Sequence, residues 1–144
     1  MFRVTRRYQF AASHRLHAAQ LTEEENRRLY GKCNNPFGHG HNYVLEVSAR
    51  GPLEEATGYA VDIAQLDSLV AREVLAPMEH ANLNKDVKSF ERVVPTSENL
   101  AAEILERLKN GWTQAFPGEW PSLEKVRIAE TARNIFEMDA DEIE

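Results

Sequence analysis

The chain is organised around Cys33-Asn34-Asn35-Pro36-Phe37-Gly38-His39-Gly40-His41-Asn42-Tyr43, which places the only cysteine six residues before a His-Gly-His. If a strand begins at His39, the rings of His39 and His41 share one face, about 6.6 Å apart at the backbone, because side chains alternate along a strand. One metal ion can then bind both rings. Zinc is the usual ion for such a site, and three protein ligands would leave its fourth position open for a substrate.

Alternating apolar and polar residues predict two long strands around these histidines. Residues 2–14 form the first strand, and His14 continues its buried face at the strand end. Residues 39–47 begin the second strand, which stops at Gly51-Pro52. The 15–38 insertion makes the two strands natural antiparallel neighbours and brings His14 beside the histidine pair. Taken singly, a histidine in this position is more often a hydrogen-bonded core residue than a metal ligand.

Capping signals predict a short helix in the insertion and a longer helix after the second strand. Thr22-Glu23-Glu24-Glu25 fits a capping box, so a short helix starts there and ends near Gly31. His17, in irregular chain before it, is expected at the surface. Asp62 is the N-cap of the longer helix, whose apolar stripe closes at Ala76-Pro77.

The C-terminal third predicts one more helix and a hairpin. The helix opens at Thr96, its apolar stripe reaches Trp112, and residues 111–121 are expected to form a loop. The two hairpin strands and the turn between them are expected at residues 125–130, 134–138 and 131–133. The acidic tail, residues 139–144, is expected to fray.

Length and composition indicate one globular domain, residues 1–144. The net charge of −6 argues against nucleic-acid binding, yet residues 1–50 carry 8 Lys/Arg against 4 Asp/Glu. This basic end, which includes Arg15, Arg27 and Lys32, could attract a small polyanion such as a phosphate ester. Solvated surface side chains are the alternative interpretation for any one of them.

A single cysteine and the absence of long apolar runs predict a cytoplasmic protein that does not enter a membrane. One cysteine excludes internal disulfides, and an unpaired thiol is typical of a reducing compartment. The N-terminus has no apolar signal segment, and no run of 18 apolar residues occurs anywhere.

Several other polar residues are candidates that also have ordinary explanations. Glu130 continues the buried face of residues 125–130, where an ionised carboxylate is costly unless it accepts hydrogen bonds, so it invites a ligand with donors. Glu79-His80 follows a helix, where such a pair is more often surface than chemistry. Helix capping accounts for the polar residues Thr96, Ser97 and Glu98.

Five motifs follow one another along the chain. They are Ala12-Ser13-His14-Arg15, Cys33 to Tyr43, Glu79-His80-Ala81-Asn82-Leu83, Thr96-Ser97-Glu98-Asn99 and Glu130-Thr131. In this order they resemble the 6-pyruvoyltetrahydropterin synthase family over nearly the whole chain. The resemblance implies an α+β tunnelling fold (T-fold), in which a four-stranded antiparallel sheet has two helices on one face. It also implies a homo-oligomer, usually a hexamer of two stacked trimers, whose sheets join into a barrel and whose active sites lie between subunits.

The resemblance also implies a role for each candidate residue. The zinc ligands would be His14, His39 and His41. Cys33 would be the catalytic thiol, and His80 with Glu79 the relay that adjusts its proton affinity. Glu130 would anchor the pterin ring and take part in proton relay, in a pocket that is also lined by Thr96, Ser97 and Glu98. The substrate would be 7,8-dihydroneopterin triphosphate, which loses triphosphate.

Two features bear on the branch of the family. Glu79 stands where the family usually has aspartate, one methylene shorter. Five residues separate Cys33 from His39, which resembles the pyruvoyl-forming branch. The alternative is the 6-carboxytetrahydropterin synthase of the queuosine (deazapurine) pathway, which typically has a shorter spacer and also releases acetaldehyde.

Two interpretations from other classes are compatible with three histidines. A zinc hydratase or hydrolase would use the open metal position to activate water, but it would leave Cys33 and Glu130 without a role. A non-catalytic domain stabilised by metal would fold with zinc and have no reactive thiol.

Overall fold

Two long strands, β1 (Phe2–His14) and β2 (His39–Gly51), form the centre of a sheet. In the computed structural model, which describes residues 1–142, they pair antiparallel from Phe2 opposite Gly51 to His14 opposite His39. Their buried apolar side chains, such as Phe10 of β1 and Leu45 of β2, fall on one face, as the sequence predicts. The pairing therefore confirms that His14 lies beside the histidine pair.

Three further strands complete the sheet in the order β3-β1-β2-β4-β5. β4 (Ser122–Ala129) pairs antiparallel with β2, and β5 (Ile135–Asp139) pairs antiparallel with β4. These are the predicted hairpin strands. β3 (Ala81–Asn82) was not predicted, because two residues are too few to show an alternation, and it runs parallel to β1.

The helices pack on one face of this sheet. The bounds of the α-helices are α1 Glu23–Tyr30, α2 Ile63–Val70, α3 Ala76–Met78, α4 Leu83–Asp86 and α5 Ser97–Ala115. A π-helical segment, Ala71–Leu75, joins α2 to α3, and 3-10 turns occur at Gly31–Asn34, Lys88–Glu91 and Ala140–Glu142. The expected caps Thr22, Asp62 and Thr96 each accept a backbone hydrogen bond at a helix start.

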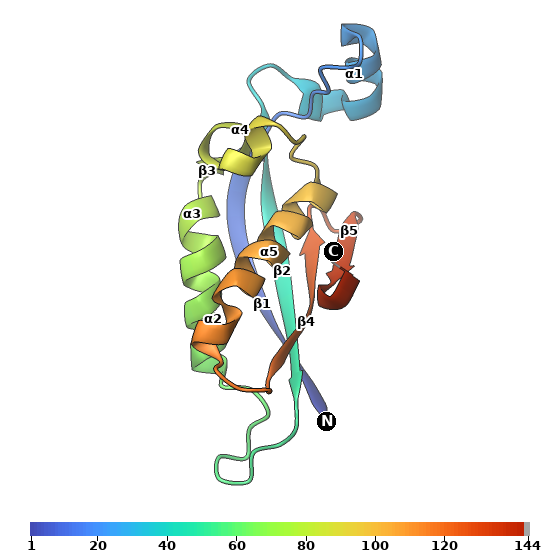
Figure 1. Cartoon of the computed structure of the whole chain (residues 1–144). Helices are drawn as coiled ribbons and strands as arrows, with labels where there is room; N and C mark the ends of the chain where they lie inside the picture. Colours follow the sequence, from blue (N-terminus) through green and yellow to red (C-terminus); the bar gives the residue numbers. More distant parts are fainter. Residues whose placement is uncertain (143–144) are drawn as a thin grey trace.

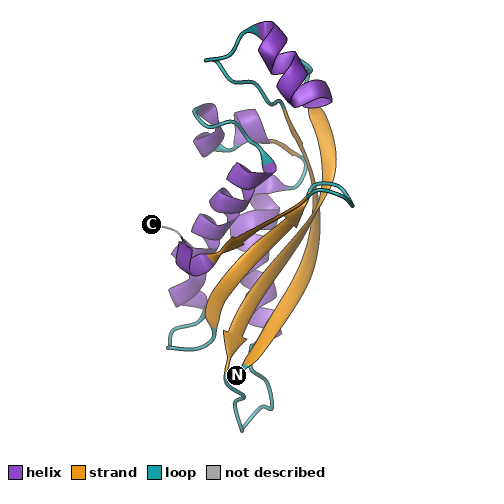
Figure 2. Ribbon diagram, turned by 90° about the vertical axis from the view of Figure 1, so that its right-hand side faces the viewer, coloured by secondary structure: helices purple, strands orange, loops and turns teal. Residues whose placement is uncertain are grey.

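The architecture is an α+β fold of two layers, which confirms the expected fold class. Figure 2 shows the strands as one curved layer with the helices against one side and no helix on the other. α2, α3 and α5 cover the inner face, whereas α1 stands apart at the end of β1 and β2 (Figure 1). The core between the layers contains fully buried residues such as Leu45 of β2, Leu66 of α2 and Leu105 of α5. No helix in residues 1–142 is long and apolar enough to cross a membrane.

The predicted helix continues through Ala76-Pro77 and ends at Met78, directly before Glu79-His80, as expected. Proline lacks the N–H that would bond to the carbonyl four residues earlier, which is that of Glu73. Arg107 Nη1 donates to this carbonyl at 3.4 Å instead. The turn before the proline is also widened, since Ala76 N–H donates to the carbonyl of Ala71.

The expectations for the 111–121 loop and for the acidic tail are corrected. The predicted loop at 111–121 begins too early, because α5 continues through Gly111 to Ala115. The tail does not fray from residue 139: Asp139 ends β5, and Ala140 is only 8% exposed and packs into the core. Residues 143–144 of that tail lie outside the described part of the chain.

Gly111 lets α5 lie close to α2. A Cβ at this position would sit 2.8 Å from Leu69 Cδ1 and 3.3 Å from Glu73 Cγ. Leu69 is fully buried, so its side chain has little freedom to move.

We predict that Gly111→Ala lowers the free energy of unfolding by about 1 kcal/mol, because overpacking of about 1–3 kcal/mol outweighs a helix-propensity gain of about 1 kcal/mol. Asn110→Ala, at the exposed neighbouring position, is the matched control and should not destabilise the chain. Urea unfolding of the three proteins measures both effects, and a more stable Gly111→Ala protein would contradict the close packing.

Candidate active site

His14 is the buried centre of the site, at the end of β1. Its side chain is fully shielded from solvent, and its Nδ1 lies 2.9 Å from the carbonyl oxygen of Pro95. A carbonyl only accepts hydrogen bonds, so Nδ1 carries the proton and donates it. The lone pair of Nε2 therefore points toward His41, whose Nε2 is 3.1 Å away.

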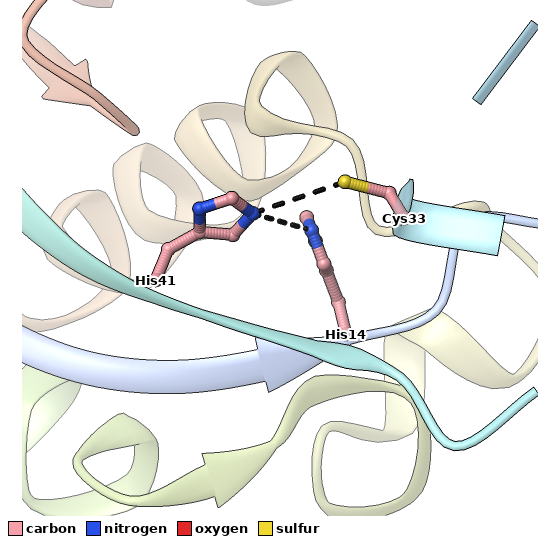
Figure 3. A group of neighbouring side chains, drawn as sticks. All are labelled: His14, Cys33 and His41. Atoms are coloured by element: carbon pink, nitrogen blue, oxygen red, sulfur yellow. Dashed lines mark hydrogen bonds between the residues drawn. The ribbon is translucent and has the colours of Figure 1, made fainter. Parts of the chain in front are cut away.

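His14, Cys33 and His41 form a cluster of possible metal ligands (Figure 3). Their donor atoms lie within 4.8 Å of one another, and Cys33 Sγ is 3.9 Å from His41 Nε2. Tetrahedral zinc with bonds of about 2.0–2.1 Å to nitrogen and about 2.3 Å to sulfur separates two nitrogens by about 3.3 Å and nitrogen from sulfur by about 3.6 Å. The cluster is thus close to the dimensions that one such ion requires.

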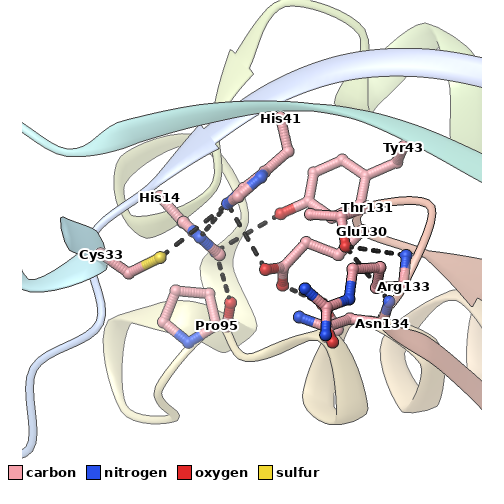
Figure 4. Close-up of polar contacts among 10 residues, drawn as sticks. His14, Cys33, His41, Tyr43, Pro95, Glu130, Thr131, Arg133 and Asn134 are labelled. Atoms are coloured by element: carbon pink, nitrogen blue, oxygen red, sulfur yellow. Dashed lines mark hydrogen bonds and ion pairs between the residues drawn. The ribbon is translucent and has the colours of Figure 1, made fainter. Parts of the chain in front are cut away.

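Glu130 extends the polar cluster away from the thiol. It follows the last residue of β4, and its Oε1 lies 3.7 Å from His41 Nε2 with the side chain 15% exposed. Its Oε2 accepts a hydrogen bond from the hydroxyl of Ser97, the buried first residue of α5. The sequence predicts that the Glu130 carboxylate needs hydrogen-bond donors. The protein itself supplies a donor, Ser97, to one of the two oxygens. Figure 4 shows the carboxylate turned toward the imidazoles.

Burial decides the protonation states in the cluster. Loss of solvation lowers the pKa of His14 and of His41, although nearby Glu130 opposes the shift. Both imidazoles are then neutral, as metal ligands must be. Loss of solvation and the Glu130 charge both raise the pKa of Cys33, so the protein alone keeps this thiol protonated.

His39 lies beside the cluster but outside it. The residue is exposed, and its ring meets that of His41 edge to face with centroids 4.7 Å apart. The structure thus brings together two of the three predicted histidine ligands and Cys33. Ligation by His39 stays a prediction.

Glu79 and His80 lie apart from Cys33 within one chain. The His80 side chain is 80% exposed, and its Nε2 contacts Glu79 Oε1 at 3.3 Å. Glu79 Oε2 also accepts from the backbone N–H of Ala11 at 2.8 Å. His80 lines a hollow on the uncovered sheet face, beside Ser13 and Asn42. Among residues 1–142 it has no contact with the thiol, so its relay role stays a prediction.

The three residues at the start of α5 have separate positions. Thr96 is the N-cap and accepts from Asn99 N at 3.2 Å, whereas Glu98 is exposed in the first turn. Only Ser97 is buried and faces Glu130. His17, expected at the surface, is half-buried, and its Nδ1 is 3.2 Å from Asn34 Nδ2.

Sequence reasoning missed two groups that orient His14. Tyr43 Oη lies 3.4 Å from His14 Nδ1, and the Tyr43 side chain is fully buried. The alternation of His41 and Tyr43 on one strand face could have identified it. The Pro95 carbonyl is a backbone group, and no residue pattern marks such an acceptor.

A large hollow lies away from this cluster. It measures about 820 Å³ and is lined by apolar residues such as Leu53, Tyr59 and Phe116, near the loop that follows β2 (Figure 1). It contains none of the predicted site residues.

Comparisons with known proteins agree with this geometry. The family described as 6-pyruvoyl tetrahydropterin synthase matches residues 3–141. A relative from Poecilia reticulata named 6-pyruvoyl tetrahydrobiopterin synthase is 42% identical over 92% of this chain and 86% of its own length. The solved 6-pyruvoyl tetrahydropterin synthase of Caenorhabditis elegans superposes with a TM-score of 0.85 at 40% identity, over 96% of this chain and 94% of that one. A 6-carboxy-5,6,7,8-tetrahydropterin synthase from Haemophilus influenzae is 26% identical over 95% of this chain and 98% of its own length.

The cluster predicts a specific loss of metal binding. We expect His41→Ala to weaken Zn²⁺ binding by about 100-fold or more, because a direct ligand should matter at least as much as the partners that orient it. His17→Ala, which removes a histidine outside the cluster, is the control and should bind zinc as the unchanged protein does. Titration against a competing chelator measures both, and equal affinity in His41→Ala would exclude the cluster as the metal site.

Proposed function

We propose, on the premise that the chain belongs to the 6-pyruvoyl tetrahydropterin synthase family, that it converts 7,8-dihydroneopterin triphosphate to 6-pyruvoyltetrahydropterin and triphosphate as a zinc-dependent carbon–oxygen lyase. The observation that carries the proposal is the polar cluster in which His14, His41, Cys33 and Glu130 converge. It offers metal ligands, a thiol and a carboxylate, which are the groups that this reaction uses. A free thiol also suits the reducing cytoplasm.

His14 and His41 would hold the zinc, with His39 as the third ligand. Two nitrogen atoms already face each other at 3.1 Å, and the exposed His39 side chain stands next to His41. Zinc bound by neutral imidazoles supplies a positive charge that acidifies the substrate hydroxyls and the adjacent C–H bonds. With Cys33 left unbound, its sulfur is available for proton transfer.

Cys33 would act as the base. As thiolate it takes a proton from a side-chain carbon, and the electron pair of that C–H bond moves into the dihydropterin ring, which is protonated, so that the ring is reduced while the side chain is oxidised. In a later step the bond from carbon to the triphosphate oxygen breaks, with its electron pair leaving on that oxygen. Burial and Glu130 raise the pKa of the thiol, so a nearby positive charge must reverse this shift. A bound cation at His14 and His41 is one source of that charge, and a protonated His80 is the other.

Glu130 would bind the pterin ring. An ionised carboxylate can accept two hydrogen bonds, one from the ring amide and one from the exocyclic amine. Ser97 donates to Oε2 and so fixes the orientation of the carboxylate. Thr96 and Glu98 would line the pocket only at its rim, because Thr96 already caps α5 and Glu98 faces solvent.

We further propose that the enzyme is a homo-oligomer, a hexamer built as a dimer of trimers. Two strand edges in residues 1–142 lack a partner strand: the outer edge of β5, and most of the edge of β1 beyond its short pairing with β3. Such edges favour pairing between chains. His80 and Glu79 lie near one of them, so their relay to a thiol would act between subunits.

The alternative product is 6-carboxytetrahydropterin. The cluster suits both reactions, since both begin from the same substrate and metal. The pyruvoyl product is favoured by the five-residue spacer between Cys33 and His39. The Poecilia reticulata relative on that branch is 42% identical to this chain, and the Haemophilus influenzae relative on the other branch is 26% identical.

Product analysis tests the proposed reaction. We expect the zinc-loaded protein to convert 7,8-dihydroneopterin triphosphate to 6-pyruvoyltetrahydropterin and triphosphate without acetaldehyde, as followed by mass spectrometry and an aldehyde assay. Release of acetaldehyde with a carboxylated pterin would establish the alternative. Recovery of unchanged substrate would reject both.

Two variants separate the role of the Cys33 sulfur from that of the His39 imidazole. Cys33→Ala should keep zinc and lose at least about 100-fold in turnover, because proton-transfer groups contribute roughly that much or more. His39→Ala should lose zinc. Metal analysis together with a turnover assay measures both, and the reverse pattern, with zinc lost from Cys33→Ala and kept in His39→Ala, would make Cys33 a ligand instead of the base.

A further inference from the structure

The thiol of the cluster comes from outside the sheet. His14 and His41 stand on the paired strands, whereas Cys33 lies in the 3-10 turn Gly31–Asn34 of the insertion between them (Figure 3). Strand pairing ends at His14, so the register of the sheet does not by itself fix the sulfur. The distance of 3.9 Å from Cys33 Sγ to His41 Nε2 therefore depends on how this turn is attached to the chain that follows β1.

Leu16, two residues after the end of β1, is bonded to the turn through both of its main-chain polar groups. Its N–H donates to the Cys33 carbonyl at 2.7 Å, and its carbonyl accepts from Asn34 Nδ2 at 2.7 Å. A carbonyl only accepts hydrogen bonds, so the nitrogen of the Asn34 amide faces it. Leu16 is 9% and Asn34 7% exposed, so water has little access to either bond. The turn thus pairs with Leu16 as a neighbouring strand would, with a side-chain amide as the second partner.

Arg15, which joins His14 to Leu16, is held in the same way by another asparagine. Asn84 of α4 accepts a hydrogen bond from the Arg15 backbone N–H at 2.7 Å and donates to the Arg15 carbonyl at 2.9 Å. Both distances are normal for hydrogen bonds between amide groups. The main chain is therefore fixed from the metal ligand His14 to the residue that binds the turn, and the Asn34 amide is the side-chain contact that completes the connection to the thiol.

We infer that Asn34 is a positioning residue of the proposed reaction, because its side-chain amide ties the turn to Leu16 and so holds the Cys33 thiol beside the metal site. The inference rests on the proposed function, since it concerns the base of that reaction. Reacting atoms must lie within about 3–3.5 Å of each other, and a misplacement of about 1 Å can cost about 100-fold in rate. Without the amide the buried Leu16 carbonyl has no donor, so the turn and the chain are expected to move apart until water reaches it.

Alkylation of the thiol tests its position directly, because Cys33 is the only cysteine of the chain. In the unchanged protein, zinc should alter the rate of alkylation by iodoacetamide by at least about tenfold, since a cation close to the sulfur changes its thiolate character strongly. In Asn34→Ala the effect of zinc should fall below about threefold. Asn34→Leu, which removes the donor but keeps a side chain of similar size, should behave like Asn34→Ala.

Asn35→Ala is the matched control. It removes the amide of the next residue, which is exposed and accepts a hydrogen bond from the Phe37 N–H at 3.0 Å within the spacer. The effect of zinc on alkylation in this variant should equal that in the unchanged protein.

Zinc affinity and turnover separate this role from a purely structural one. Asn34→Ala should bind zinc as the unchanged protein does in competition with a chelator, because the imidazoles come from the strands. Its kcat for dihydroneopterin triphosphate should fall by at least about tenfold, as expected for a displaced base, while KM stays within about twofold. Loss of zinc from this variant, or an equal fall of kcat in Asn35→Ala, would overturn the inference.

The remaining outcomes also decide the inference. Thermal unfolding establishes that each variant is folded, and if neither Asn34→Ala nor Asn34→Leu folds, Asn34 serves the fold and the inference is overturned. It is also overturned if zinc has no effect on alkylation in the unchanged protein, or an equally large effect in the Asn34 variants. Selective loss of the zinc effect in a protein that does not turn over the substrate would support the placement of the thiol and reject the proposed function.

Discussion

The antiparallel pairing of β1 with β2 is the constraint on which the rest of the molecule depends. The thirteen-residue strands stay in register from Phe2 opposite Gly51 to His14 opposite His39. Because side chains alternate, a slip of one residue would turn His14 and the apolar core residues to the uncovered face. One register thus sets both the hydrophobic core under the helices and the position of the first imidazole.

The cluster is buried, and the charges of its groups do not balance. Desolvation keeps the imidazoles neutral and the thiol protonated, which leaves Glu130 as the anion beside them. Such an arrangement attracts a cation and donors from a ligand. The Pro95 carbonyl and the Ser97 hydroxyl fix His14 and Glu130 from the start of α5, so this helix positions the site as well as covering the core.

One chain provides most of the groups of the proposed site, but Glu79 and His80 lie away from the cluster. The cluster lies at the end of the covered sheet face, whereas Glu79 and His80 lie at the uncovered face and hold the β1 edge through the Ala11 N–H. The longer Glu79 side chain thus has a structural contact within the chain.

The sequence by itself determined the two central strands, the three main helices and the C-terminal hairpin, and it indicated the chemical type of the site. Alternation identified β1 and β2, caps located α1, α2 and α5, and the spacing of Cys33, His39 and His41 indicated a metal centre, because these signals are local in the chain. Only the tertiary structure decided which groups meet. It packs α5 closely against Leu69 at Gly111, where a side chain would not fit, and gives the Glu73 carbonyl a donor from Arg107 where Pro77 has no N–H. It also leaves His39 exposed while Cys33 lies close to His41. Those outcomes depend on contacts between residues far apart in the sequence. No residue pattern marks such contacts, and none marks a backbone acceptor such as the Pro95 carbonyl.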